Sequence, residues 1–256
     1  MMKNAIIFLY LILFPSIVFS QGENLLKSWD SKIYNPKNEG VNFLSFDAKV
    51  NGLAESLKTT LIIPNISKVF FKITWDKKNQ FKINLMGLPK GFNELKNSLE
   101  STMIDKLRFF IPTSFYEPLS EYQISTKIVE SGTQYTLEDK SFLKEATKVE
   151  VFFNKAKNLS KMEIYSLRGK EVNSFTFEDS SIENKLLIKD FLVENVSAQG
   201  VFALSYSIEY AKVNKFVLPK KILISSQLHS TPTENGQKQV FSESKYEVSF
   251  SNFSVK

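Results

Sequence analysis

The chain contains no cysteine, and this absence removes several kinds of chemistry at once. Disulfide bonds, cysteine nucleophiles and zinc sites built on thiolates are all excluded. A lipid-attachment cysteine behind an export signal is excluded as well, so we expect a mature protein without a lipid anchor. The fold must then rest on a hydrophobic core without covalent crosslinks, and residues 21–256 are long enough to build one.

Histidine and glycine are scarce too. His229 is the only histidine, so zinc sites with two or more histidine ligands are excluded. A Ser-His-Asp site needs just one histidine, but the polar loop around His229 lacks a motif and indicates a surface turn residue. No two of the nine glycines lie two positions apart, which rules out G-x-G-x-x-G, and the P-loop and G-x-S-x-G patterns are also missing. We expect no cofactor and no metal.

The charged residues do not point to nucleic acid or to hydrolysis. The net charge is +6, but Arg108 and Arg168 are the only arginines and the lysines are scattered, so nucleic acid is not an expected partner. Carboxylate pairs occur at Glu138-Asp139 and Glu178-Asp179. Adjacent carboxylates at strand ends are typical of turn caps, whereas a glycosidase needs two separated groups. We therefore predict that the protein is not an enzyme.

The first twenty residues have the pattern of a cleaved signal peptide. Lys3 is their only charge, and Ala5–Phe14 is an unbroken apolar run. Val18 and Ser20 are small enough for a signal peptidase site, which predicts cleavage before Gln21. An uncleaved anchor is the alternative, but the apolar stretch is shorter than the roughly 20 residues that cross a bilayer. We expect a soluble, exported protein, periplasmic or secreted.

Two segments have helical periodicity. Residues 23–34 place Leu25, Leu26, Trp29 and Ile33 at helical spacing. Residues 92–108 show an amphipathic pattern in which Phe92, Leu95, Leu99, Met103 and Leu107 recur at three- and four-residue intervals. The sequence therefore predicts two helices, one at the start of the mature chain and one inserted into a β protein.

The rest of the mature chain alternates with period two between turn signals. The predicted strands are 43–50, 57–63, 69–75, 81–85, 124–130, 133–137, 148–153, 161–167, 170–177, 185–194, 202–210, 215–226 and 238–251. Short spacings with turns between them favour one continuous antiparallel layer. The predicted fold is mainly β: one domain over residues 21–256, with a large curved antiparallel sheet (a half-open barrel) of eleven to thirteen strands covered by one or two helices.

Phenylalanine is abundant, with 23 residues, and most fall in strand-like segments. A sheet with so apolar a face must either be covered or hold something apolar. The candidate cavity-facing residues on the strands are Phe71, Ile73, Trp75, Phe81, Ile83 and Leu85. The candidates on the covering helix are Leu95, Leu99 and Met103. Plain core packing is the alternative reading for each of them.

Two stretches carry a resemblance to a known family. The segment Lys161–Val172 (KMEIYSLRGKEV) resembles a hairpin with an I-Y-x-x-x-G-K turn, and Phe216–Ile224 (FVLPKKILI) resembles a late L-P-x-K-I strand. The closing segment Tyr246–Val255, which contains Asn252, is similar to a terminal strand. With the order of elements, these features are similar to the LolA/LolB-like superfamily of bacterial envelope proteins.

The resemblance implies a half-open antiparallel barrel closed by helices that carries lipid or lipoprotein acyl chains in the periplasm. Its implied partners are a lipid or the acyl chain of a lipoprotein, and envelope membrane proteins. LolA-type carriers have a functional arginine on an inner strand, a role in which neither Arg108 nor Arg168 can be placed. The alternative is a secreted structural or protein-interaction β protein with no small-molecule ligand.

Overall fold

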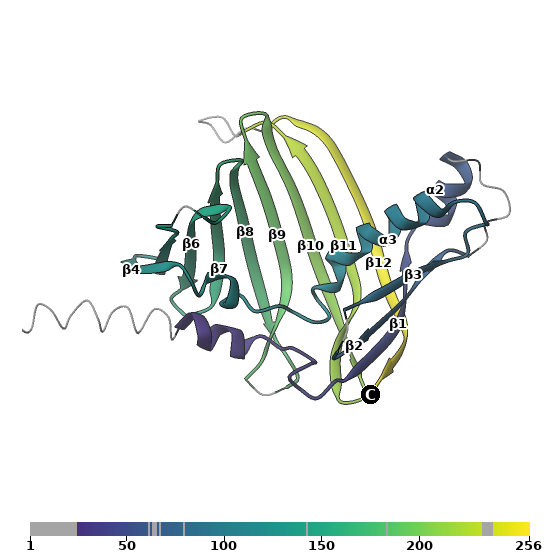
Figure 1. Cartoon of the computed structure of the whole chain (residues 1–256), viewed down its shortest axis with the longest axis horizontal. Coiled ribbons are helices and arrows are strands. Elements are labelled where there is room, and N and C mark those ends of the chain that lie inside the picture. The colour runs from purple at the N-terminus through teal and green to yellow at the C-terminus, as the bar shows by residue number, and fades with distance from the viewer. Residues whose placement is uncertain are drawn as a thin grey trace, which may run out of the picture.

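The computed structural model describes residues 25–60, 62, 66, 68–78, 80–141, 143–182, 184–231 and 238–256. The signal peptide predicted over residues 1–20 lies outside this part of the chain. Within it, the chain forms one 12-stranded antiparallel sheet with the strand order β3-β2-β1-β12-β11-β10-β9-β8-β7-β6-β5-β4 (Figure 1). The sheet is open because β3 and β4 are edge strands, and the predicted mainly-β class with a large curved antiparallel sheet is confirmed.

The strands follow the predicted segments closely. They are β1 (Phe43–Val50), β2 (Phe70–Asp76), β3 (Lys82–Met86), β4 (Gln123–Val129), β5 (Gly132–Glu138), β6 (Ala146–Asn154), β7 (Leu159–Ser166), β8 (Gly169–Asp179), β9 (Leu186–Ser197), β10 (Gly200–Val213), β11 (Phe216–His229) and β12 (Val240–Val255). Strands that follow one another pair as neighbours, except where α3 separates β3 from β4, and the first and last strands meet where β12 pairs with β1. The β1–β12 pairing joins the meander of β1–β3 to that of β4–β12, so that all twelve strands form one sheet.

In the part of the chain that the structure describes, α-helices occupy three places. Residues 25–32 form the N-terminal helix, α2 spans Leu53–Thr60 and α3 spans Asn93–Leu107. A short 3-10 turn, η1 (Glu117–Leu119), follows α3. None of the helices in the described ranges is both long and apolar enough to cross a membrane.

The strand predicted over residues 57–63 is wrong where it can be compared, because residues 57–60 belong to α2. Gly52 has a positive φ of 75° and turns the chain out of β1. Leu53 and Leu57 then lie one helical turn apart, and Leu57 is buried. A short apolar run is compatible with either a strand or a turn of buried helix, and in this structure the segment is a helix.

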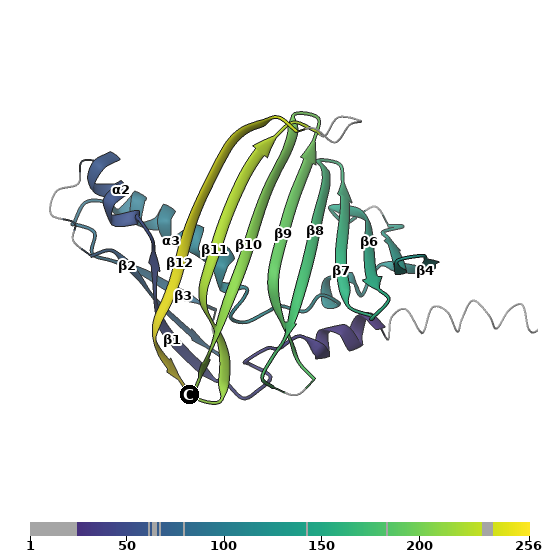
Figure 2. The ribbon, with the colours of Figure 1, turned by 180° about the vertical axis from the view of Figure 1, so that it is seen from behind.

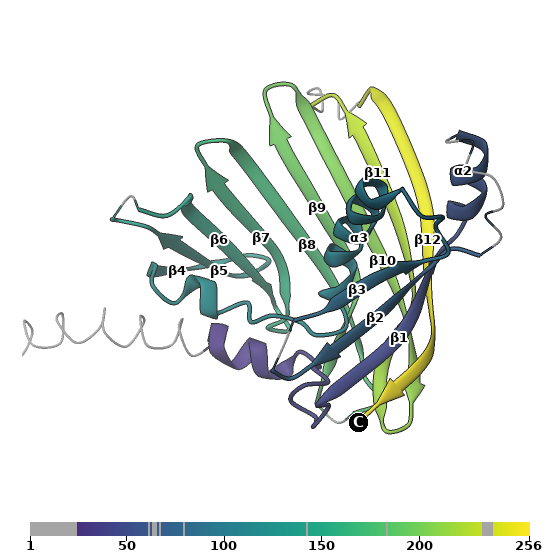
Figure 3. The same cartoon turned by 45° about the vertical axis from the view of Figure 1, so that its right-hand side comes forward.

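Helix α3 lies on the concave side of the sheet, whereas α2 lies at the end of the sheet beyond β1 and β12. Figure 3 shows α3 within the curve formed by β1, β2, β3 and β10–β12, and Figure 2 shows the convex side with the strands in front of α3. The N-terminal helix covers the other arm, where the Trp29 ring packs edge-on against Phe153 (5.8 Å) and Phe177 (5.1 Å). The two predicted covering helices thus lie over different parts of the sheet.

Residues 108–116, here called the connecting segment, run from α3 to η1 across the concave face (Figure 1). Phe110 stacks on Phe46 of β1 with ring centroids 4.2 Å apart and meets Phe250 of β12 edge-on at 4.8 Å. Phe109 packs against Tyr206 of β10 at 5.2 Å. The centre of the core is therefore filled by the segment that leaves α3.

Candidate functional site

The predicted cavity residues come together on the concave face. Phe71 pairs with Leu85 and Ile73 with Ile83 across β2 and β3, so their side chains share a face. Phe71, Ile73, Trp75, Leu85 and Met103 are buried, whereas Phe81, Ile83, Leu95 and Leu99 are partly buried and pack against the same cluster. Among the described residues, none of these side chains lines any of four surface pockets. Here the concave face holds a packed interior.

Polar contacts hold α3 on the edge of this packed region. The backbone N–H of Leu85 on β3 donates to Glu100 Oε1 at 2.6 Å, which satisfies a donor on an edge strand. Lys96 Nζ donates to Asn84 Oδ1 at 2.7 Å and lies 3.7 Å from Glu100 Oε1. Side chains of α3 thus take the place of a further strand beside β3.

An apolar pocket lies on the concave face, between the connecting segment and strands β7–β9. Its volume is about 340 Å³. Strands β7, β8 and β9 provide one wall and the connecting segment provides the other. The lining residues are Arg108, Phe109, Pro112, Thr113, Ser114, Phe115, Met162, Ile164, Glu171, Asn173, Phe175, Ile188 and Phe191. Most of these side chains are apolar, which is typical of a small-molecule site.

The strand wall of the pocket follows from the antiparallel register. Phe175 on β8 is directly opposite Phe191 on β9, and their rings stack at 5.0 Å with an interplanar angle of 23°. Met162 on β7 is opposite Asn173 on β8. Residues opposite one another in a ladder point to the same face, so these side chains form one continuous surface.

The opposite wall is fixed by the N-terminal helix. Asp30 accepts hydrogen bonds from Phe115 N at 2.7 Å, from Tyr116 N at 3.1 Å and from Ser114 Oγ. Asn35, just beyond the helix, donates from Nδ2 to Pro112 O at 2.8 Å. These bonds hold the segment that carries Phe115 against the sheet, where its ring meets Phe175 at 5.5 Å.

Polar residues interrupt the apolar lining, and two of them, Arg108 and Glu171, are charged. The Arg108 guanidinium lies over the rings of Phe191 (5.2 Å) and Tyr206 (5.4 Å). Burial raises the pKa of Tyr206, and the nearby Arg108 charge offsets only part of that effect. Asn173 is buried and donates from Nδ2 to Glu171 Oε1 at 2.7 Å. The pocket therefore has a cation beside its aromatic floor and a carboxylate further along β8.

The convex side of the same strands carries a charged cluster. Glu163 on β7 accepts from Lys161 (2.8 Å), Lys170 (2.7 Å) and the Tyr165 hydroxyl (2.7 Å). Burial alone would raise the pKa of Glu163, but these hydrogen bonds outweigh burial and lower it to about 2. Burial raises the pKa of Tyr165, and the carboxylates of Glu163 and Glu150 raise it further. Each carboxylate oxygen is occupied, so we assign this cluster to the stability of the sheet.

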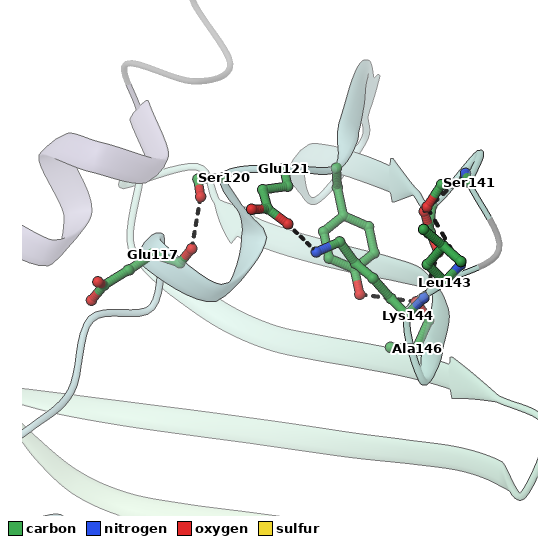
Figure 4. A network of polar contacts seen from close by, with 9 residues as sticks. Glu117, Ser120, Glu121, Ser141, Leu143, Lys144 and Ala146 are labelled. Atoms are coloured by element: carbon green, nitrogen blue, oxygen red, sulfur yellow. Dashed lines mark hydrogen bonds and ion pairs between the residues drawn. The ribbon is translucent and has the colours of Figure 1, made fainter.

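A second polar network joins the chain before β4 to the turn after β5 (Figure 4). Lys144 pairs with Glu121, and this contact lowers the pKa of Glu121 and raises that of Lys144. Asp139 accepts from Ser141 Oγ, Ser141 N and Lys144 N, and these bonds lower its pKa. Asp139 therefore caps a turn, as expected for a carboxylate at a strand end. Tyr122 closes the network by donating to Ala146 O at 2.9 Å.

His229 is not the surface turn residue that its polar neighbours indicated. It is only 2% exposed, because β11 continues to His229 and places it between Val201 of β10 and Val240 of β12. Its Nδ1 lies 2.7 Å from Ser230 O. In the described ranges, no group of three or more His, Cys, Asp or Glu side chains is arranged to hold a metal ion.

The sequence did not predict the pocket, because the pocket is lined by segments that lie far apart in the sequence. Phe175, Phe177 and Phe191 alternate on predicted strands, but nothing local indicates which other strand each faces. The run Arg108-Phe109-Phe110 directly after an amphipathic helix was an available signal, since three large side chains at a helix end rarely all face water.

Comparisons with known proteins identify no relative. No family model matches the sequence, and no curated protein and no solved structure matches it significantly.

Proposed function

We propose that this chain is an exported protein that binds and carries an apolar ligand, such as a lipid or the acyl chain of a lipoprotein, without changing it covalently. The observation that carries the proposal is the pocket of about 340 Å³ on the concave face, with Phe109, Phe175 and Phe191 in its lining. An apolar pocket with few convergent polar groups is suited to binding an apolar molecule rather than to group transfer.

The packing of the rest of the concave face supports one localised site. In front of β1 and β12, Phe110 of the connecting segment stacks on Phe46 and meets Phe250, so this part of the face is filled. The pocket opens where the connecting segment spans β7–β9. A ligand would then enter beside the connecting segment, and release would require movement of this segment rather than of the whole α3 cover.

Export to the periplasm and the LolA/LolB-like relationship belong to the same proposal. The signal-peptide pattern of residues 1–20 and the LolA/LolB resemblance of the hairpin at 161–172 support them. N-terminal sequencing of the protein recovered from an envelope fraction tests the location. A chain that begins at Gln21 is expected, and an intact Met1 in the cytoplasmic fraction would overturn export.

Native mass spectrometry after gentle purification tests ligand binding directly. We expect an adduct that organic extraction removes, and binding of a fluorescent fatty-acid analogue to the stripped protein. The variant Met162→Trp adds bulk to the pocket wall and should weaken that binding roughly tenfold, about 1.4 kcal/mol. Met86→Trp is the matched control, because Met86 is an exposed residue of β3 remote from the pocket lining.

A protein without adducts that also fails to bind the analogue would overturn the carrier proposal. Equal effects of the two tryptophan variants would show that binding, if present, occurs elsewhere. These outcomes separate the pocket from nonspecific adsorption to the apolar surface.

A second candidate is a structural or protein-interaction role, and one observation favours it. Phe202 on β10 and Leu228 on β11 are cross-strand neighbours that remain 42% and 40% exposed at one end of the sheet. Val240 and Phe241 at the start of β12 are exposed at the same end. Apolar side chains grouped in this way suit a protein contact. Loss of self-association or partner binding in Phe241→Ser, with ligand binding unchanged, would support this role.

A further inference from the structure

The strongest unassigned feature is Arg108, a cation at the border of an apolar pocket. It is one of two arginines in the chain. Its guanidinium lies 5.2–5.8 Å from the centroids of Phe109, Phe191 and Tyr206. Nη2 is 3.5 Å from the Tyr206 hydroxyl, a long contact. Within the described ranges, Arg108 has no carboxylate within 4.0 Å, whereas Arg168 is paired with Glu145 at 3.6 Å.

A structural role explains only part of this arrangement. Arg108 follows the last turn of α3, and its Nε donates to Asp105 O at 2.8 Å, so it stabilises the negative end of the helix. A guanidinium has five N–H donors, and this bond uses one of them. A helix-end role does not require that the group lie over the aromatic floor of a pocket, and a lysine directed to water would serve as well.

We propose that the pocket binds a single-chain amphiphile with an anionic head group, a carboxylate or a phosphate, and that Arg108 holds the head. This inference rests on the proposed function and names its ligand class. The planar guanidinium can donate two parallel hydrogen bonds to either oxyanion. Phe175, Phe191 and Ile188 then contact the chain.

The second charged residue in the lining fixes the orientation. Glu171 lies on β8 four residues before Phe175, which is roughly 13 Å along an extended strand. Its carboxylate is held by Asn173 and repels an anion at that end of the pocket. Arg108 is at the Phe191 end, so the head group lies there and the chain runs away from it.

The volume limits the size of the ligand. About 340 Å³ is near the lower end of the roughly 300–1,000 Å³ range of small-molecule pockets. One acyl chain fits that space better than the several chains of a lipoprotein anchor or a phospholipid. We therefore select a short single-chain set as test ligands: dodecanoate, dodecyl phosphate and dodecanol.

The experiment measures the dissociation constants of these three ligands by isothermal titration calorimetry on the stripped full-length mature protein. The wild type should bind dodecanoate or dodecyl phosphate roughly tenfold more tightly than dodecanol, since a charge-assisted hydrogen bond at a partly exposed site contributes about that much. Arg108→Gln should remove this preference, so that the two anions bind no more tightly than dodecanol. Arg168→Gln is the matched control and should retain the preference.

The outcomes separate the inference from the function on which it depends. Equal binding of dodecanol and both anions by the wild type overturns the anionic ligand class but leaves an apolar carrier intact. Preference for anions that survives in Arg108→Gln also overturns the assignment. No binding of any ligand overturns the proposed function itself. If Arg108→Gln does not fold, Arg108→Lys tests the same point: a reduced preference supports bidentate recognition, and an unchanged one argues against it.

Discussion

The two arms of the concave face contrast in how their apolar surfaces are covered. In the arm formed by β12, β1, β2 and β3, aromatic rings stack tightly: Phe110 lies on Phe46 and meets Phe250. In the arm formed by β7, β8 and β9, Phe175 and Phe191 also stack, but an open pocket adjoins them. The contrast indicates that the same kind of apolar sheet face can have two roles. Where side chains of the covering segment fill the space, it forms hydrophobic core. Where the covering segment leaves space between itself and the sheet, it forms a pocket that can bind a ligand.

The difference has a physical origin in the covering elements. α3 carries a row of apolar side chains and is followed by Phe110, which fills the space in front of β1 and β12. Phe109 instead packs on Tyr206 of β10 and borders the pocket. The segment after Phe110 has no helix until η1 and is held at its backbone by Asp30 and Asn35. An extended backbone brings fewer side chains per unit length to a face than a helix does, so space remains.

Truncating one ring on each arm gives the largest expected effect and tests this contrast. Phe110→Ala should lower the free energy of unfolding by about 3–5 kcal/mol, because it leaves a cavity among packed rings. Phe115→Ala should cost only about 1–2 kcal/mol, since Phe115 is partly buried and borders the pocket, but it should weaken ligand binding more than its stability loss suggests. Urea denaturation and a binding titration measure the two quantities.

The two variants break the comparison if their effects are exchanged. A small stability loss in Phe110→Ala would show that the α3 arm is loosely packed. Unchanged binding in a folded Phe115→Ala variant would show that the connecting segment is not a wall of the ligand site.

Much of the fold could be read from the sequence because it depends on local patterns. The alternation in Val69–Trp75 identifies a strand and its buried face, and the helical spacing in 92–108 identifies α3. α2 was missed because Leu57 and its neighbours form a short run that fits a strand or a helix equally well. Here the turn at Asn51-Gly52 and burial of Leu57 against the core decide the outcome.

The candidate site could not be read in the same way because it depends on pairing at a distance. Arg108 meets Tyr206, 98 residues away, and Asp30 meets Phe115, 85 residues away. A sequence pattern shows that a strand has an apolar face, but not which remote segment covers it. The choice of β2, β3 and α3 as cavity walls therefore rested on their apolar pattern alone, and in the structure these residues are buried in the hydrophobic cluster or pack against it.

Removing a charge on the convex side tests whether the stability of the arm that carries the pocket depends on contacts on the opposite face of the same strands. Glu163 lies on β7 between the pocket residues Met162 and Ile164, on the other face. Its pKa is lowered from 4.5 to about 2, so it contributes stability that is fully present above about pH 4.5 and is lost as the pH falls through about 2. Glu163→Gln should therefore cost about 1–2 kcal/mol at pH 7, less than the full shift implies because Lys161 and Lys170 are partly exposed.

Urea denaturation at several pH values measures this dependence. The stability difference between the wild type and Glu163→Gln should shrink as the pH is lowered from about 5 to about 2. Glu194→Gln, on β9 of the same arm and without an ion pair among the described residues, is the control and should cost little stability. A constant difference for Glu163→Gln would mean that the charge of Glu163 is not what stabilises the pocket arm.

The smallest expected effect concerns the other arm, in which polar contacts attach α3 to the edge of the sheet. Glu100 accepts from Leu85 N at 2.6 Å and is partly buried, so Glu100→Ala should cost about 1 kcal/mol and speed hydrogen exchange of the Leu85 amide roughly fivefold. Glu100→Gln keeps an acceptor and should fall between the wild type and Glu100→Ala. Glu94→Ala, an exposed change in the first turn of α3, should leave the Leu85 amide protected. If Glu100→Ala also leaves the Leu85 amide protected, apolar packing alone holds α3 on the sheet. The polar contacts between α3 and the edge strand β3 would then contribute nothing to the stability of the filled arm.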